Sequence, residues 1–182
     1  SAPGGKSLAI LQLFNPKKLI STDIHEHKVK ILNELKNKYG YSNFEVKLND
    51  AAQIENLNTK FDKILLDMPC SGLGVLRKKP EKIYELTSND IKSLKKLQKK
   101  IFESAYKCLK SGGEMIYSTC TFSKNENTNN IQYFLEKYED LEILEVEIPK
   151  NIETVRDEFG GVYISYKNEY LDGFYIAKLR KK

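Results

Sequence analysis

Short apolar runs alternate with longer amphipathic segments along this chain. The apolar runs, which are typical of buried strands, lie at residues 18–22, 44–48, 61–66, 114–118, 141–146 and 173–179. Segments in which apolar side chains recur every three or four positions lie at 7–14, 25–39, 89–109 and 125–138. That spacing predicts helices, the third of them capped by Asn89 or Asp90 and ended by Gly112-Gly113. Strands that alternate with helices predict a largely parallel sheet.

The composition of the 182 residues indicates one globular domain, residues 1–182. Hydrophobic residues make up 40% and charged residues 30%, a balance that excludes a disordered chain. We expect no membrane partner, because no apolar run approaches the roughly 18 residues that a membrane span needs. The net charge of +5 favours a polyanionic partner, although the lysines would equally serve solubility.

Three cysteines stand at positions 70, 108 and 120. This odd, sparse set argues against a disulfide framework and for a reducing compartment, so we expect a cytoplasmic protein. No CxxC pair is present and the histidines are distant in sequence, so no metal is expected. Cys108 lies on the apolar face of a predicted helix and is expected in the core. Cys70 and Cys120 each follow a predicted strand, where chemical roles are more common than packing roles.

Acidic residues and a glycine-rich segment mark other strand ends. Two adjacent glycines, Gly4 and Gly5, precede the first helix and would let its N-terminus approach a ligand, although an ordinary turn explains them equally well. Asp23 ends a strand, where it would accept hydrogen bonds from ribose hydroxyls or cap the next helix. Asp50 is placed to hold an adenine amino group or to form a turn.

Two longer motifs surround the cysteines. The segment DMPCSGLGVLRKKPE occupies residues 67–81, and GGEMIYSTCTFSKNEN occupies 112–127. Arg77, Lys78 and Lys79 would contact phosphates, or would form a solvated charge run. On chemistry alone either Cys70, which follows a proline, or Cys120, which follows a threonine, would serve as a nucleophile.

With SAPGGKS at 1–7 and DGFYIAKLRKK at 172–182, these motifs resemble the RsmB/Nop2/Sun family of RNA cytosine-5 methyltransferases over essentially the whole chain. The bacterial 16S ribosomal RNA members are the most similar. The resemblance implies a Rossmann-like, S-adenosylmethionine-dependent methyltransferase fold, an α/β fold with a mostly parallel sheet and an antiparallel last strand. Compared with the family, the first strand and an N-terminal RNA-binding region appear absent.

The resemblance also implies a role for each motif. The methionine part of S-adenosyl-L-methionine would be cradled by Ser1, Ala2, Pro3, Gly4, Gly5 and Lys6. Asp23 would bind the ribose, Asp50 the adenine, and Asp67 would lie beside both cofactor and target base. Cys120 would be the nucleophile that methylates carbon 5 of an RNA cytosine, and Cys70 would assist product release.

The chemistry explains why two thiols are needed. Carbon 5 of cytosine is a poor nucleophile until a thiolate adds to carbon 6 of a base that has left its stack. A neutral carboxyl at Asp67 would assist at N3, and Lys6 is a candidate for lowering the pKa of Cys120. A transfer RNA substrate and a non-catalytic RNA-binding module for ribosome assembly remain alternatives, although a pure binder has no use for two placed thiols.

The apparent lack of a central strand leads to one prediction about the chain by itself. Its neighbours in the sheet would be unpaired, which disfavours folding and a formed cofactor pocket. We therefore expect weak binding of S-adenosylmethionine, and an inactive fragment, unless another chain or a rearrangement fills the gap. Micromolar or tighter binding in a calorimetric titration would contradict this.

Overall fold

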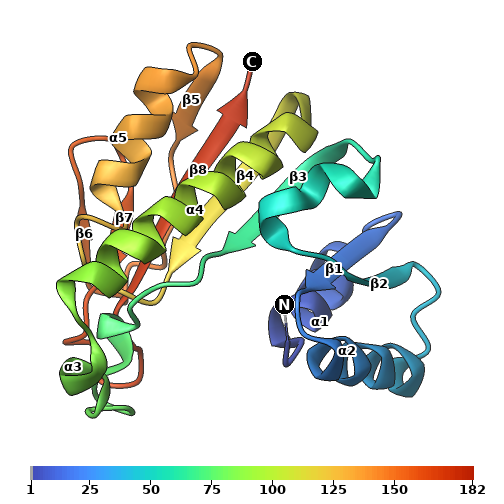
Figure 1. Cartoon of the computed structure of the whole chain (residues 1–182), viewed down its shortest axis with the longest axis horizontal. Coiled ribbons are helices and arrows are strands. Elements are labelled where there is room, and N and C mark those ends of the chain that lie inside the picture. Colours follow the sequence, from blue (N-terminus) through green and yellow to red (C-terminus); the bar gives the residue numbers. More distant parts are fainter. Residues whose placement is uncertain (1) are drawn as a thin grey trace. The chain divides into compact units, whose positions relative to one another are not determined.

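The computed structural model describes residues 2–182, apart from the side chain of Glu85. The chain divides into two compact units, Ser1–Asn58 and Thr59–Lys182. Figure 1 labels the helices and strands of each. In the part of the chain that is described, no helix combines the length and the apolar character required to cross a bilayer.

The first unit pairs two strands in parallel and packs helices against them. Its elements are α1 (Gly5–Phe14), β1 (Leu19–Asp23), α2 (Glu26–Tyr39), β2 (Phe44–Leu48) and the short helix η1 (Ala51–Leu57). Leu11, Leu32 and Phe44 form its buried core. Gly4 has a φ of 104°, and a Cβ there would lie 2.5 Å from a methyl carbon of Leu35, so the start of α1 packs against α2 only with glycine at this position.

The second unit is a sheet in the order β3-β4-β8-β7-β6, with β5 also paired to β8. Its strands are β3 (Phe61–Asp67), β4 (Leu109–Thr119), β5 (Leu141–Leu144), β6 (Thr154–Arg156), β7 (Val162–Ile164) and β8 (Phe174–Lys181). Strands β3 and β4 are parallel, whereas β8 runs antiparallel to β4 and confirms the predicted direction of the last strand. The later pairings, which involve β5, β6 and β7, are also antiparallel.

Helices α4 (Ser88–Cys108) and α5 (Thr128–Lys137) lie on one face of this sheet (Figure 1). Phe102 of α4 stacks on Phe134 of α5 with ring centroids 3.6 Å apart, and both rings are fully buried. Cys108 is buried at the end of α4, which confirms its predicted place in the core. The loops that follow β3 contain the short helices η2 (Leu73–Val75) and α3 (Lys82–Glu85).

Several local predictions were wrong. Thr87 caps α4 through a reciprocal pair of hydrogen bonds with Asp90. The cap therefore lies two residues before Asn89, the earlier of the two predicted caps. The helix ends at Cys108, and residues 109–113 extend β4 instead of ending the helix. The strands β6 and β7 were not predicted. Strand β3 was predicted to be buried, yet Leu65 is 39% exposed, because β4 is the only strand that pairs with β3 in the described part of the chain.

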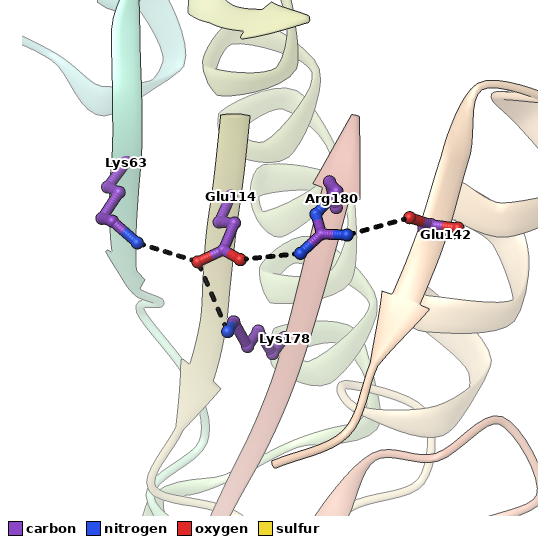
Figure 2. A network of polar contacts seen from close by, with 5 residues as sticks. All are labelled: Lys63, Glu114, Glu142, Lys178 and Arg180. Atoms are coloured by element: carbon purple, nitrogen blue, oxygen red, sulfur yellow. Dashed lines mark hydrogen bonds and ion pairs between the residues drawn. The ribbon is translucent and has the colours of Figure 1, made fainter. Parts of the chain in front are cut away.

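A row of charged side chains crosses four strands on the sheet face opposite α4 and α5 (Figure 2). Glu114 accepts from Lys63 at 2.9 Å and from Arg180 at 3.2 Å, and lies 3.3 Å from Lys178. Arg180 reaches on to Glu142 at 3.6 Å. The cations, Lys63 foremost, lower the pKa of Glu114 to about 2. Because such cross-strand pairs each contribute roughly 0.2–1 kcal/mol, the row helps to fix the order β3-β4-β8-β5.

Candidate active site

The parallel register of β3 and β4 brings the two loop cysteines together. The pairing continues past Asp67, since the Met68 N–H donates to the Ser118 carbonyl at 2.9 Å. Cys120 follows the end of β4 directly, and the sulfur atoms of Cys70 and Cys120 lie 3.2 Å apart. Both side chains are partly accessible to solvent. The two thiols therefore lie side by side at the carboxyl ends of the parallel strands, where parallel sheets carry their functional groups.

The two thiols have unequal affinities for a proton. A hydrogen bond from Cys70 lowers the pKa of Cys120 to about 7, although burial and the negative charge of Asp67 oppose this, while Lys82 assists. The same hydrogen bond, together with burial and the charge of Cys120, raises the pKa of Cys70. The pair therefore loses its first proton near neutral pH, and the thiolate that results is centred on Cys120.

Removal of the Cys70 thiol is expected to raise the pKa of Cys120. In Cys70→Ala the hydrogen-bond donor is lost, so the midpoint of Cys120 alkylation should move from about pH 7 to higher pH. Labelling at pH 7 should slow, and labelling at pH 10 should change little. Peptide-resolved mass spectrometry with iodoacetamide measures this. Cys70→Ser keeps a donor and is the matched control, and an unchanged midpoint in Cys70→Ala would contradict the assignment.

A buried carboxylate, Glu126, holds the Cys70 loop in place. Its side chain is fully buried and accepts from the Ser71 N–H at 2.9 Å and from the Ser71 hydroxyl at 2.5 Å. The amide of Gln98 on α4 donates to the same carboxylate at 3.0 Å and to the Pro69 carbonyl at 2.9 Å. Ser71 is thus bonded directly to Glu126 and Pro69 is linked to it through Gln98, so the residues on both sides of Cys70 are held by one buried acid that accepts from three donors.

The loop that contains Cys120 is held by Asn127, the residue after Glu126. Its side-chain amide donates to the Thr121 carbonyl at 2.9 Å and accepts from the Thr119 hydroxyl at 2.6 Å. Ser71 and Thr121 share a hydrogen bond of 2.8 Å between their hydroxyls, which joins the two loops. Glu126 and Asn127 were noted in the sequence without a role. Both lay inside the helix predicted over 125–138, whereas α5 begins at Thr128, and nothing local in the sequence indicates that both side chains are buried.

Two further charged groups of the second unit act on the thiol pair. Asp67, at the end of β3, is exposed and influences Cys120 through its charge. Lys82 on α3 extends along the Cys70 loop, with its Cε 3.1 Å from the position of a Cβ on Gly72. Its positive charge favours the Cys120 thiolate. The prediction that Lys6 contributes in the same way stays a prediction.

The first unit gathers the predicted cofactor residues at the ends of β1 and β2. The Asp23 carboxylate accepts from the His25 N–H at 3.1 Å and from the Ala2 N–H at 3.5 Å, which places the glycine-rich segment beside it. Asp50 follows β2 and caps η1 through the Ala52 N–H at 2.8 Å. Both acids thus make the local turns that were the alternative to ligand binding.

The glycine-rich segment is open on the side of Gly5. Within residues 2–182, apart from its chain neighbours and the backbone of its own helix, no atom lies within 4 Å of the position that a Cβ on Gly5 would take, and this residue begins α1. An open helix start beside the Asp23 carboxylate fits a ligand that carries both an anionic group and hydroxyls. Pro3 and Lys6 belong to the same segment, and Ser1 lies outside the described residues.

Arg77 and Lys78 have partners within the fold. This was predicted neither by the phosphate-contact interpretation of residues 77–79 nor by the alternative of a solvated charge run. The Arg77 guanidinium donates to the carbonyls of Tyr166, Asn168 and Glu169 at 2.5, 3.2 and 2.7 Å. Lys78 pairs with Asp172 at 2.7 Å. Arg77 therefore holds the segment 166–172 in place, and a phosphate would have to compete with three carbonyls for it. Among residues 2–182 no group of three or more His, Cys, Asp or Glu side chains is arranged to hold a metal.

The chain is similar to known RNA methyltransferases. The family model described as 16S rRNA methyltransferase RsmB/F matches residues 1–180. The chain is 36% identical to the probable ribosomal RNA small subunit methyltransferase B of Bacillus subtilis, over 100% of this chain and 42% of that protein. It is 34% identical to the tRNA (cytosine(72)-C(5))-methyltransferase of Pyrococcus horikoshii, over 100% of this chain and 45% of that protein.

A solved structure has the same fold. The crystal structure of NSun6 from Pyrococcus horikoshii with SFG superposes with a TM-score of 0.87 at 32% identity, over 100% of this chain and 46% of that one. The chain thus spans roughly two fifths of the length of the curated relatives that it matches.

Proposed function

Because the chain belongs to the 16S rRNA methyltransferase RsmB/F family, we propose that it carries the catalytic residues of an RNA cytosine-5 methyltransferase that acts on ribosomal RNA. The observation that carries the proposal is the thiol pair at the ends of two adjacent parallel strands, with the sulfur atoms 3.2 Å apart. Methylation at carbon 5 needs one thiol that attacks and one group that later helps the attacking thiol to leave. A binding module needs neither.

The residues of the first unit fit S-adenosylmethionine as the cofactor. The segment Ala2–Lys6 would hold its methionine part, Asp23 its ribose and Asp50 its adenine, each with a side chain or backbone group of suitable chemistry. When bound, the cofactor supplies an electrophilic methyl group. The solved NSun6 structure with SFG, an analogue of this cofactor, supports the assignment.

The thiolate of Cys120 starts the proposed reaction. Its sulfur adds to carbon 6 of the flipped cytosine, and the electron pair of the 5,6 double bond becomes available at carbon 5 for the methyl group. Asp67 in its protonated form would donate a hydrogen bond to N3 and stabilise the charge that develops on the ring. Loss of the proton from carbon 5 then restores the double bond and expels the Cys120 sulfur.

Adduct formation changes the state of Cys70. Once Cys120 is bonded to the base, its negative charge is gone, and with it one cause of the raised pKa of Cys70. The Cys120 N–H donates to the Cys70 sulfur at 3.3 Å and would then favour a thiolate there. The pKa of Cys70 therefore falls when the adduct forms, so that its thiolate is available at the stage when a base is needed. We assign the release step to this second thiol.

A transfer RNA substrate is the second candidate. The tRNA methyltransferase relative is nearly as similar as the ribosomal one, at 34% against 36% identity. The product of the complete gene, incubated with S-adenosylmethionine and with RNA from a strain that lacks the gene, distinguishes them. We expect 5-methylcytosine to appear in small-subunit ribosomal RNA. Methylation of transfer RNA alone would transfer the proposal to that substrate, and no methylation of either RNA would favour the non-catalytic module.

A further inference from the structure

A hollow of about 330 Å³ opens beside the thiol pair in the second unit. Its walls come from three segments: Leu73, Gly74, Leu76 and Arg77 after Cys70, Phe122 after Cys120, and Tyr166, Leu171 and Asp172 near the C-terminus. We call it the aromatic hollow, because Phe122 and Tyr166 line it with ring centroids 6.3 Å apart. Phe122 is two residues from Cys120, at most about 7 Å along the backbone. The hollow therefore lies on the same loop as Cys120, whose carbonyl accepts from the N–H of Gly74 in the hollow's wall.

The walls of the aromatic hollow are fixed by hydrogen bonds. Gly74 donates to the Cys120 carbonyl at 2.9 Å and accepts from the Gly173 N–H at 2.9 Å, so the three segments meet at this glycine. A Cβ on Gly74 would lie 2.0 Å from the Gly173 carbonyl oxygen, so no side chain fits there. The Arg77 clamp on the carbonyls of Tyr166 and Glu169 holds the outer wall. These hydrogen bonds hold the concave surface in a preformed shape.

The chemistry of the aromatic hollow suits a flat, uncharged ring. Phe122 is 46% exposed and Tyr166 is 60% exposed, while Leu171 adds a third apolar side chain. The one acid in the lining, Asp172, is neutralised by Lys78. Lys79, the next residue in the chain after Lys78, is exposed and is a candidate phosphate contact. Exposed aromatic faces with cations at the rim are the usual means by which proteins hold unpaired bases.

We propose that the aromatic hollow binds the base of a nucleotide next to the target cytosine, stacked on Phe122 and in edge contact with Tyr166, whose ring is inclined by 49° to that of Phe122. This rests on the proposed function, because it assumes an RNA whose cytosine has reached Cys120. A cytosine that leaves its stack deprives its neighbour of a stacking partner, and the aromatic hollow, whose Phe122 is two residues from Cys120, would supply a replacement. The hollow would thereby help to select sites at which the target cytosine and its neighbour are both unpaired.

The test uses the product of the complete gene and a short RNA centred on the mapped cytosine. Phe122→Ala and Tyr166→Ala are each expected to raise the KM for this RNA about tenfold, the scale of one lost base stack. An RNA with an abasic residue at one flanking position should lose the same factor with the unaltered protein. The variants should lose little more on the abasic RNA, because the base and the ring act on one another.

Two controls separate this inference from simpler outcomes. Tyr170→Ala removes an aromatic side chain that is 85% exposed and does not line the hollow, and should leave the KM unchanged. Phe122→Trp retains a stacking face and should retain the low KM, even if Phe122→Ala lowers the melting temperature. If the unaltered protein methylates no RNA, the proposed function fails. If it methylates RNA, but an abasic residue on neither side of the target cytosine raises the KM, only the hollow proposal fails. The same holds if the variants keep their KM for RNA and lose binding to a protein instead.

Discussion

Cys70→Ser is expected to turn the protein into one that remains covalently attached to its RNA, whereas Cys120→Ser should abolish methylation without attachment. Serine at position 120 is not ionised near neutral pH, so the addition to carbon 6 fails, and the rate should fall by at least about 10³-fold. Serine at position 70 leaves the attack intact but cannot become the base that the release step needs. The adduct then accumulates.

Denaturing electrophoresis with labelled RNA measures the outcome directly. The Cys70→Ser protein should give a band of reduced mobility that survives denaturation and contains both protein and RNA. The double variant Cys70→Ser/Cys120→Ser should give no such band. Cys108→Ala, which alters a thiol buried in the core, is the matched control and should neither trap RNA nor stop methylation. Trapping by Cys120→Ser instead would exchange the two roles.

The asymmetry of the thiols is the part of the site that depends most on the structure. The sequence places both cysteines after strands, and the chemistry accepts either as nucleophile. In the structure Cys70 donates to Cys120, and the pKa values of the two move in opposite directions. Such an order of ionisation depends on which sulfur is more buried and which backbone N–H groups it meets, and residue spacing contains neither quantity.

The proximity of the thiols, by contrast, was predictable. Apolar runs at 61–66 and 114–118 predicted two parallel strands, and the rule that functional groups gather at their carboxyl ends put Cys70 and Cys120 at one edge. The strands β6 and β7 escaped because three-residue strands have too few positions for a period to show. Arg77 escaped because a guanidinium that binds three backbone carbonyls has the same sequence appearance as one that binds a phosphate.

Glu126 is the residue for which the second large effect is expected. Glu126→Ala would leave the Ser71 N–H, the Ser71 hydroxyl and the Gln98 amide without their acceptor in a site that excludes water. An unpaired buried donor costs about 1–3 kcal/mol, so the loss of unfolding free energy should be about 3–5 kcal/mol. Thermal or denaturant unfolding measures it. Glu136→Gln on the exposed side of α5 is the control and should change the stability little.

Glu126→Gln separates the positioning role of this residue from its contribution to stability. The amide oxygen can still accept from the Ser71 N–H and from Gln98, but the NH2 group then faces the Ser71 hydroxyl, which must accept instead of donate. We expect this reversal to displace the Cys70 loop even where the protein still folds. Cys70 then ceases to donate to Cys120, and the midpoint of Cys120 alkylation should rise above pH 7, as in Cys70→Ala. Methylation should fall with it, mainly through kcat at pH 7, and should recover in part at higher pH because thiolate is restored. A folded Glu126→Gln protein with an unaltered alkylation midpoint would show that the carboxylate stabilises the fold without positioning the thiols.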